Sequence, residues 1–282
     1  MYPLLDVKLA AKRLMTGVTL QFAERGAPTG EAIVFLHGYT DSWFSFSRVL
    51  PLLPHEYRAL ALTLRGHGDS EKPDCCYAID DFVADVVAFL DACEIGQATI
   101  VGMSGGSFIA QLAALDYPQR VSRLVLISSA PTLQGNEAVA GLGHEMLRLE
   151  DPITPQFVTE WQQVNLYRPV PDDFFETVVS ESLKLPARVW RNFWKGVVLA
   201  PDHSSRLGEI SVPTLVLWGE QDAVFSRDDP TQLAAAIPNA TLKVYPETGH
   251  SVHWERPEEV VRDLVAFMKA TPPDLQDEAT AI

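Results

Sequence analysis

The sequence predicts an α/β fold in which a mostly parallel, eight-stranded sheet is flanked by helices. Apolar segments of strand length alternate with longer segments of helical periodicity, which is typical of β–α–β units. The strand-length segments are apolar without interruption, as strands are when both faces of a sheet are covered. With 282 residues, of which 47% are hydrophobic and 21% charged, the chain can bury a large core without metal or disulfide cross-links.

The expected parallel strands are apolar runs, most of which end in glycine or in a turn. They lie within Ala32–Gly38, Arg58–Gly68, Ala98–Gly106, Arg123–Pro131, Pro213–Asp222 and Thr241–His250. A further segment, Val18–Glu24, is expected to pair antiparallel at one edge of the sheet. Parallel strands bring their carboxyl ends to the same edge, which is where α/β proteins bind their ligands.

Helices are expected between these strands. From Ile79 to Leu90 the apolar residues are spaced three and four apart, as on one face of a helix. Asp229 and Pro230 are typical of an N-cap followed by the first helical residue, and Pro257 is expected to open the last helix in a similar way.

One long region contains no strand-like run and is expected to form a helical cap inserted between two strands. Its helical pieces are rich in aromatic residues, namely Phe157, Trp161, Tyr167, Phe174, Phe175, Trp190, Phe193 and Trp194. We predict a core of residues 1–131 and 199–270, a cap of residues 132–198, and a frayed tail of residues 271–282. Some of the cap aromatics are expected to line an apolar pocket between cap and sheet.

The charge balance is acidic, since 22 Lys and Arg against 37 Asp and Glu give a formal net charge of −15. This balance disfavours nucleic acids and anionic membranes as partners, because both are bound through clusters of basic residues. No segment approaches the roughly 18 uncharged apolar residues of a membrane span, and the N-terminal segment has no signal-peptide core. We therefore expect a cytoplasmic protein, monomeric or homodimeric, whose partner is a small-molecule substrate.

The three cysteines, Cys75, Cys76 and Cys93, form neither a Cys-x-x-Cys motif nor a cluster with histidine. No thiolate metal site is predicted from them. A bridge between the neighbours Cys75 and Cys76 would be strained, so all three are expected to be reduced thiols.

The most informative peptide is a Gly-x-Ser-x-Gly motif formed by Gly102, Ser104 and Gly106. It follows an apolar strand and precedes a helical pattern, which is the context of a nucleophile elbow. A turn this tight strains the backbone of the serine and leaves no room for side chains two residues to either side, so glycine is needed there. The motif predicts that Ser104 is a nucleophile at the carboxyl edge of the sheet.

A serine nucleophile needs a base, and the base needs an acid to orient it. Asp222 and His250 follow the last two predicted strands, so their loops are expected to open on the same edge as Ser104. Glu220 could replace Asp222, but it lies closer to its strand. His253 is a weaker rival of His250 and is expected to pack in the following turn.

Acyl transfer also needs hydrogen-bond donors for the negative charge that develops on the carbonyl oxygen. The backbone N–H of Gly105, directly after the nucleophile, is one expected donor. The second is assigned to the backbone N–H of Tyr39, in the loop after the strand Ala32–Leu36. His37 and His67 lie in loops beside the site and are expected to be structural.

These motifs resemble those of the α/β-hydrolase superfamily, in the branch with a serine nucleophile and a helical cap. The matching pieces are Phe35–Trp43, Leu64–Ser70, Val101–Gly106, Leu215–Asp222 and Gly249–Val260. The resemblance is specific for fold and triad but not for substrate. The branch includes esterases, lactonases, carbon–carbon bond hydrolases, haloperoxidases, perhydrolases and small-molecule receptors. Haloalkane dehalogenases and epoxide hydrolases of this fold use an aspartate nucleophile, and position 104 is serine.

The sequence departs from the commoner Gly-His-Ser-x-Gly pattern by having Met103 before the serine and Gly105 after it. We expect this change to leave a roomier, less polar floor in the site.

The sequence thus predicts hydrolysis of an uncharged, fairly apolar carboxylic ester or lactone, with no metal or organic cofactor required. Cleavage of a carbon–carbon bond, haloperoxidase or perhydrolase activity with the same triad, and a small-molecule receptor built on a hydrolase scaffold remain alternatives.

Overall fold

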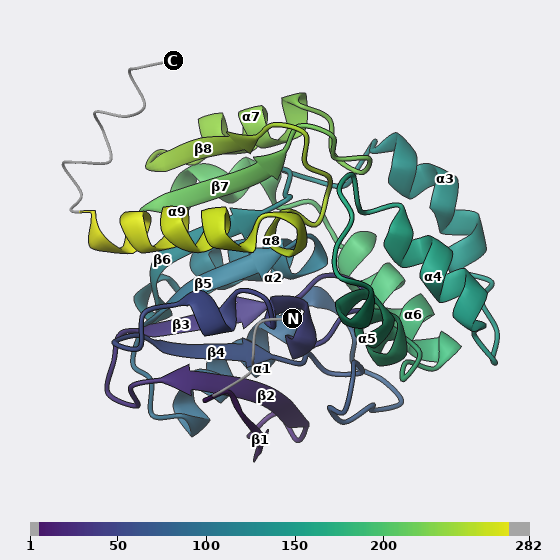
Figure 1. The fold of residues 1–282 in the computed structure, drawn as a ribbon, viewed down its shortest axis with the longest axis horizontal. Helices are drawn as coiled ribbons and strands as arrows, with labels where there is room; N and C mark the ends of the chain where they lie inside the picture. The colour runs from purple at the N-terminus through teal and green to yellow at the C-terminus, as the bar shows by residue number, and fades with distance from the viewer. Residues whose placement is uncertain (1–5, 271–282) are drawn as a thin grey trace.

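The computed structural model describes residues 6–270 of the chain, so the predicted tail of residues 271–282 lies outside the described residues. Within them, eight strands form one sheet in the order β1-β2-β4-β3-β5-β6-β7-β8 (Figure 1). The strands are β1 (Lys8–Arg13), β2 (Thr19–Gly26), β3 (Ala32–Leu36), β4 (Arg58–Leu62), β5 (Ala98–Met103), β6 (Val121–Ile127), β7 (Thr214–Gly219) and β8 (Ala240–Tyr245). The six strands from β4 to β8 in this order are parallel, which confirms the predicted sheet.

The antiparallel edge differs from the prediction by one strand. β2 pairs antiparallel with β4, as expected, but it also pairs antiparallel with β1, which forms the actual edge. All six residues of β1 are exposed. With no buried face, this strand has neither an apolar run nor an alternation that a sequence pattern could reveal.

Helices lie on both faces of the sheet and at its carboxyl end. They are α1 (Ile79–Ala92), α2 (Gly105–Asp116), α3 (Glu137–Met146), α4 (Pro155–Gln163), α5 (Asp172–Ser182), α6 (Ala187–Phe193), α7 (Asp228–Ala236), α8 (Val252–Glu255) and α9 (Pro257–Lys269). Short turns of 3₁₀ helix are η1 (Trp43–Phe46), η2 (Leu50–Leu52), η3 (Pro118–Arg120) and η5 (Ser204–Glu209), and η4 (Trp194–Val198) is a π-helical turn. The predicted helices at Ile79 and Pro257 are confirmed, whereas α7 begins at Asp228, two residues before the predicted first helical residue Pro230.

Alternate residues of each central strand enter two separate apolar clusters. In β3, Ile33 and Phe35 pack in the cluster that contains the buried face of α9, whereas Val34 and Leu36 pack in the cluster that contains α1 and α2. Figure 1 shows α9 in front of the sheet. Both faces are therefore covered, which explains why the strand sequences are apolar throughout.

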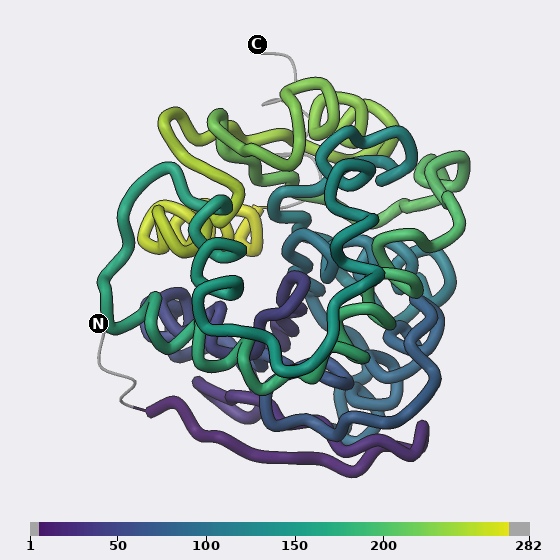
Figure 2. Tube along the Cα trace, turned by 90° about the vertical axis from the view of Figure 1, so that its right-hand side faces the viewer, coloured from purple at the N-terminus to yellow at the C-terminus, as the bar shows by residue number. Residues whose placement is uncertain are grey.

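Between β6 and β7 the chain forms α3, α4, α5, α6 and η4 in succession, followed by η5, and we call the part from α3 to η4 the helical insertion. It lies at the carboxyl ends of the parallel strands, on the right of Figure 1 and facing the viewer in Figure 2. Asn136 is the N-cap of α3, and its side chain accepts a hydrogen bond from the backbone N–H of Val139. Thr154 caps α4 in the same way, accepting from the N–H of Phe157. The helices of the insertion cover the carboxyl edge of the sheet, where α/β proteins bind their ligands (Figure 1 and Figure 2).

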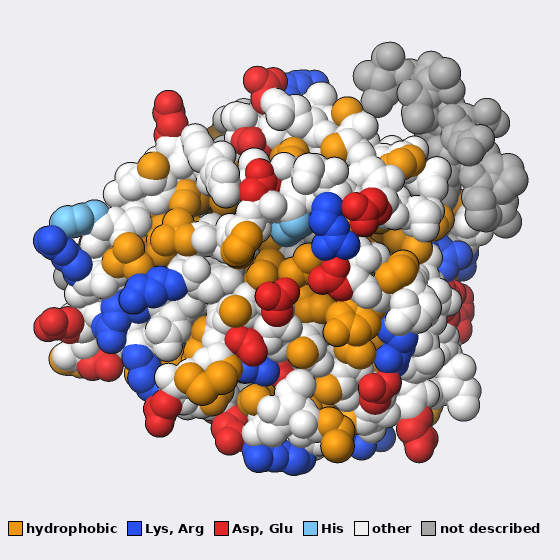
Figure 3. All heavy atoms as spheres, turned by 180° about the vertical axis from the view of Figure 1, so that it is seen from behind, with side chains coloured by type: hydrophobic (Ala, Val, Ile, Leu, Met, Phe, Trp, Pro, Cys, Tyr) orange, Lys and Arg blue, Asp and Glu red, His pale blue; other side chains and the backbone are white. Residues whose placement is uncertain are grey.

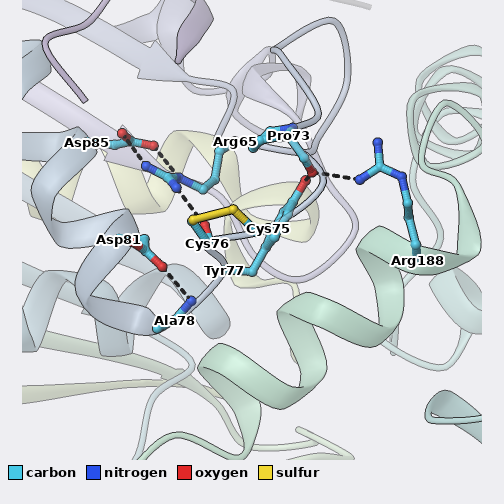
Figure 4. The surroundings of a disulfide bond; sticks show 9 residues. All are labelled: Arg65, Pro73, Cys75, Cys76, Tyr77, Ala78, Asp81, Asp85 and Arg188. Carbon is cyan, nitrogen blue, oxygen red and sulfur yellow. Dashed lines mark hydrogen bonds and ion pairs between the residues drawn. A yellow bond between two sulfur atoms is a disulfide. The ribbon is translucent and has the colours of Figure 1, made fainter. Parts of the chain in front are cut away.

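The loop between β4 and α1 contains a disulfide between Cys75 and Cys76, so the expectation that these two were reduced thiols is wrong (Figure 4). Cys93 is free and buried. Arg65, paired with Asp85 of α1 at 2.6 Å, donates to the carbonyl of Cys76, also at 2.6 Å. On the other side, Arg188 of α6 donates to the carbonyl of Pro73 at 2.7 Å. The loop is therefore fixed both to the core and to the helical insertion, a long-range arrangement that adjacent cysteines do not reveal in the sequence.

The surface carries acidic and basic side chains on the same face, with apolar side chains between them (Figure 3). Among the residues that the structure describes, no helix has the length and apolar character needed to cross a bilayer.

Candidate active site

Ser104 forms the whole turn between β5 and α2. Its backbone has φ +48° and ψ −119°, a conformation that residues other than glycine rarely adopt. A Cβ atom at Gly102 would lie 2.5 Å from the carbonyl oxygen of Gly106, and one at Gly106 would lie 2.4 Å from the carbonyl oxygen of His37. Both positions therefore exclude any other residue, because the turn brings α2 against β5 and β3.

The backbone of Ser104 is held from two sides. Its N–H donates to the carbonyl of Ile127 at 3.0 Å. Its carbonyl accepts from both the N–H and the hydroxyl of Ser107, at 2.8 Å and 2.5 Å. This fixed turn places Ser104 in the lining of a cavity between the sheet and the helical insertion.

Asp222 and His250 meet at the same edge of the sheet. Nδ1 of His250 lies 2.9 Å and 3.0 Å from the two carboxylate oxygens of Asp222. The Asp222 side chain is fully buried and also accepts from the N–H groups of Val224 and Phe225, at 2.7 Å and 3.1 Å. The carboxylate can accept only from an Nδ1–H group, so it fixes the tautomer in which Nε2 is unprotonated. His250 lines the same cavity as Ser104.

The two rival residues lie elsewhere. Glu220 is exposed and pairs with Arg227 at 3.8 Å on the surface. His253 is fully buried, with its Nε2 3.0 Å from Ser45 Oγ, and burial lowers its pKa to about 3. His253 is thus a neutral residue beneath the site and is absent from the cavity lining.

The two expected oxyanion donors lie close together. A Cβ atom at Gly105 would lie 3.6 Å from the backbone nitrogen of Tyr39, so the two amides border the same space. The same Cβ would lie 2.9 Å from the ring of Phe193, which α6 places over Gly105. The expectation of a roomier floor is therefore wrong, because an aromatic ring of the insertion fills the space that a side chain at position 105 would occupy.

Tyr39 also connects the loop after β3 to the insertion. Its hydroxyl donates to the carbonyl of Trp190 at 2.9 Å, and its ring stacks on Phe193 with 5.3 Å between centroids. Burial raises the pKa of the Tyr39 phenol well above its ordinary value, so this group stays protonated. These contacts hold the backbone of Tyr39 in place beside Ser104.

His37 and His67 are fully buried beside this loop, with ring centroids 4.9 Å apart. The N–H of Leu64 donates to Nε2 of His37, whose Nδ1 lies 2.7 Å from the carbonyl of Gly38. Burial lowers the pKa of both imidazoles, that of His67 to about 4. Both rings are therefore neutral and make backbone contacts, consistent with the structural part that the sequence suggested.

The cavity lies between the sheet and the helical insertion and is lined mainly by apolar side chains. Trp161 and Trp194 are the tryptophans of the insertion that line it, whereas Trp190 is fully buried behind them. No lysine or arginine is among the lining residues. In residues 6–270, His, Cys, Asp and Glu side chains do not gather in threes as they do around bound metals.

Two acidic residues near the site, Asp41 and Glu255, were not predicted from the sequence. Asp41, four residues after His37, lines the cavity with only 5% of its surface exposed. Glu255 accepts from the N–H of Gly249, next to His250, and from the N–H of Tyr167 in the insertion, at 3.0 Å and 3.1 Å. Each has a partner in the insertion that is distant in sequence, Gln162 for Asp41 and Tyr167 for Glu255. Only the adjacency of Asp41 to the predicted oxyanion loop could have indicated either residue.

The sheet, the strained serine turn and the Asp222–His250 pair at its carboxyl edge together define the class of α/β hydrolases. The family model described as "alpha/beta hydrolase fold" matches residues 31–257, and the chain belongs to this family.

Relatives within the family carry out different reactions. The chain is 30% identical to a 2-hydroxy-6-oxononadienedioate/2-hydroxy-6-oxononatrienedioate hydrolase of Burkholderia vietnamiensis, over 90% of this chain and 92% of the relative. It is 29% identical to a non-heme chloroperoxidase of Streptomyces lividans, over 90% and 97% of the two chains. Among solved structures, a hydrolase from Pseudomonas aeruginosa superimposes with a TM-score of 0.83 at 25% identity, covering 93% of this chain and 99% of that one.

Proposed function

We propose that the protein is a serine hydrolase that cleaves an uncharged, fairly apolar carboxylic ester or lactone through an acyl-enzyme. The observation that carries the proposal is the buried Asp222–His250 pair, whose histidine lines the same cavity as Ser104. The tautomer that Asp222 fixes leaves Nε2 of His250 able to accept a proton. A nucleophile, a base and an orienting acid are the groups that acyl transfer requires.

In the proposed reaction, His250 takes the hydroxyl proton of Ser104 as the serine oxygen attacks the ester carbonyl. Asp222 stabilises the imidazolium that forms. The backbone N–H groups of Tyr39 and Gly105 bind the oxyanion, and each such donor contributes about 3 kcal/mol to transition-state stabilisation. His250 then gives the proton to the departing alcohol, which leaves an ester of Ser104 with the acyl group.

Hydrolysis of this acyl-enzyme repeats the steps with water as the nucleophile. His250 removes a proton from water, the oxyanion forms again between the two amides, and the proton returns to Ser104 as the carboxylic acid departs. The cycle consumes one water and leaves the enzyme unchanged.

The lining of the cavity supports an uncharged substrate. Apolar side chains dominate it, and its ionisable groups besides His250 include the carboxyl of Asp41 and no lysine or arginine. A substrate with carboxylate groups, as the name of the Burkholderia vietnamiensis relative implies, would enter this cavity without a cationic partner. Carbon–carbon bond cleavage is still the second candidate, because that relative is 30% identical over most of both chains.

The test is a panel of short-chain esters, lactones and ring-cleavage diketones, assayed with the wild type and with Ser104→Ala. We expect sustained turnover of esters or lactones that exceeds turnover of the diketones and is lost in the variant, whose unfolding temperature stays close to that of the wild type. Faster cleavage of the diketones would favour the second candidate. A single turnover followed by stalling would favour a receptor, and activity retained in Ser104→Ala would exclude the proposal.

A further inference from the structure

Asp41 is a buried carboxyl in the cavity that the proposed reaction does not use. It follows β3 in the same loop as Tyr39, and 5% of its surface is exposed. One carboxylate oxygen accepts from Nε2 of Gln162, on α4 of the insertion, at 3.1 Å. The other accepts from the hydroxyl of Ser45 in η1, also at 3.1 Å. The carboxyl thus has a fixed position between the core and the insertion.

These neutral partners leave the carboxyl incompletely satisfied. Nε2 of Gln162 has two protons but lies within 3.2 Å of three acceptors, which are Asp41, Thr40 Oγ1 and Ser182 Oγ. Ser45 has one proton, and its oxygen also lies 3.0 Å from Nε2 of His253. A carboxylate can accept about four hydrogen bonds, so Asp41 retains acceptor capacity on the side of the cavity.

The carboxyl lies close to the proposed nucleophile. A Cβ atom built on Gly38 would be 2.7 Å from Sδ of Met103, 3.4 Å from Cβ of Ser104 and 3.6 Å from Oδ2 of Asp41. Ser104 and Asp41 therefore both lie beside Gly38, and both line the same cavity. A group attached a few bonds from a carbonyl carbon bound at Ser104 can therefore reach the carboxyl of Asp41.

We infer that Asp41 is a specificity-determining residue that accepts a hydrogen bond from a hydroxyl group of the substrate, close to the scissile carbonyl. The preferred substrates are then hydroxy-substituted esters or lactones whose remaining parts are apolar. This inference rests on the proposed ester hydrolysis at Ser104 and adds the feature by which such an enzyme distinguishes its substrate from simple esters. A buried acceptor that stays unpaired with the wrong substrate is an effective means of discrimination.

The electrostatics of the site agree with this geometry. Burial raises the pKa of Asp41 to about 7, and Gln162, Ser45 and the charge of His250 only partly oppose this shift. The titratable groups around it are His250, His253, which reaches it through Ser45, and Glu181 of α5, which lines a small pocket with it. A hydroxyl donor from the substrate would favour the ionised carboxylate, because it would replace part of the missing hydration.

The experiment uses matched pairs of esters, assayed by pH-stat at pH 8. Ethyl 3-hydroxybutanoate against ethyl butanoate tests a hydroxyl on the acyl side, and 2-hydroxyethyl butanoate against propyl butanoate tests one on the alcohol side. The readout is the ratio of kcat/KM within each pair, for the wild type, Asp41→Ala, Asp41→Asn and the control Ser251→Ala, which removes another hydroxyl from the cavity lining. A ratio cancels any general loss of activity that a variant causes.

We expect a wild-type ratio of at least tenfold in one of the two pairs. It should fall about 10- to 100-fold in Asp41→Ala, fall less in Asp41→Asn, which keeps a neutral acceptor, and persist in Ser251→Ala. If Asp41→Ala does not fold, a reduced ratio in Asp41→Asn carries the same conclusion.

A wild-type kcat/KM ratio near one in both ester pairs would overturn the inference. So would an unchanged ratio in the Asp41 variants, or loss of the ratio in Ser251→Ala. The proposed function fails separately, if the wild type hydrolyses none of the esters or if Ser104→Ala hydrolyses them as well.

Discussion

Two carboxylates lie at the carboxyl edge of this sheet, and they differ in the hydrogen bonds that they accept. Asp222, after β7, receives two backbone N–H groups and the imidazole of His250. Asp41, after β3, receives only a side-chain amide and a hydroxyl, and burial raises its pKa to about 7. Asp222 thus has its partners within the protein, whereas Asp41 has part of its hydrogen-bonding capacity left for a group from outside.

Under our proposals, one edge of the sheet would hold both a catalytic acid–base pair, Asp222 and His250, and a substrate-recognition residue, Asp41. A carboxylate that orients a catalytic base needs fixed donors, because any change in its position changes the tautomer and direction of the imidazole. A carboxylate that recognises a substrate must be desolvated beforehand but not fully paired, so that the correct ligand improves its environment. The comparison leads to three further predictions.

The largest effect is expected from Asp222→Asn. The amide can donate a hydrogen bond to Nδ1 of His250, which would leave the proton on Nε2 and abolish its action as a base. We expect kcat/KM for a simple ester to fall by ~10⁴-fold with the fold retained. Asp41→Asn, the matched change at the other carboxylate, should lower the same value by about tenfold or less. Comparable losses in the two variants would contradict the division of roles.

The next effect concerns stability and pH. Asp41 has a pKa of about 7 in the folded protein against an ordinary value of 3.8. When folding raises the pKa of a carboxyl, the protonated group stabilises the folded state at pH values below the pKa of the unfolded chain. This stabilisation is lost as the pH rises through the pKa of the folded protein. The free energy of unfolding of Asp41→Asn relative to the wild type should therefore increase between pH 4 and pH 7, by a few kcal/mol at most.

Thermal or urea unfolding of both proteins at several pH values measures this difference. A difference that is constant from pH 4 to pH 8, or one that decreases, would show that Asp41 is not held as a desolvated carboxyl.

A smaller effect is expected from Glu255→Gln. Glu255 accepts from the N–H groups of Gly249, Tyr167 and Arg168, and Gln would direct its own NH₂ at one of these donors. The loop that carries His250 would loosen, and kcat should fall about tenfold. The control is Glu247→Gln in the same loop, where Glu247 is 68% exposed and pairs with Arg168. Equal losses in both variants, or a change in KM alone, would contradict a positioning effect.

The sequence was sufficient for the six parallel strands of the sheet and for the placement of Ser104, Asp222 and His250 at their carboxyl edge. These features depend on local signals, since each residue follows an apolar strand and the glycines beside Ser104 are required by the turn itself. Parallel strands then bring the three loops to one edge without further information.

The remaining features depend on contacts between distant segments. β1 has no buried face and hence no pattern, and the filling of the site floor by Phe193 is set by how α6 packs over Gly105. In the sequence Asp41 is an ordinary loop residue, and only the structure shows that Gln162 and Ser45 donate hydrogen bonds to its carboxylate. Such contacts arise from tertiary packing, which hydrophobic periodicity does not encode.

The central claim, that the Asp222–His250 pair activates Ser104 as a nucleophile, is tested most directly by covalent labelling. Diethyl 4-nitrophenyl phosphate reacts with an activated serine, releases nitrophenol and leaves a stable phosphate ester. We expect one nitrophenol released per chain and, by peptide mass spectrometry, one diethylphosphate on the peptide containing Ser104, with no labelling in Ser104→Ala and much slower labelling in His250→Asn. Labelling at another residue, or equal labelling of wild type and Ser104→Ala, would contradict the account.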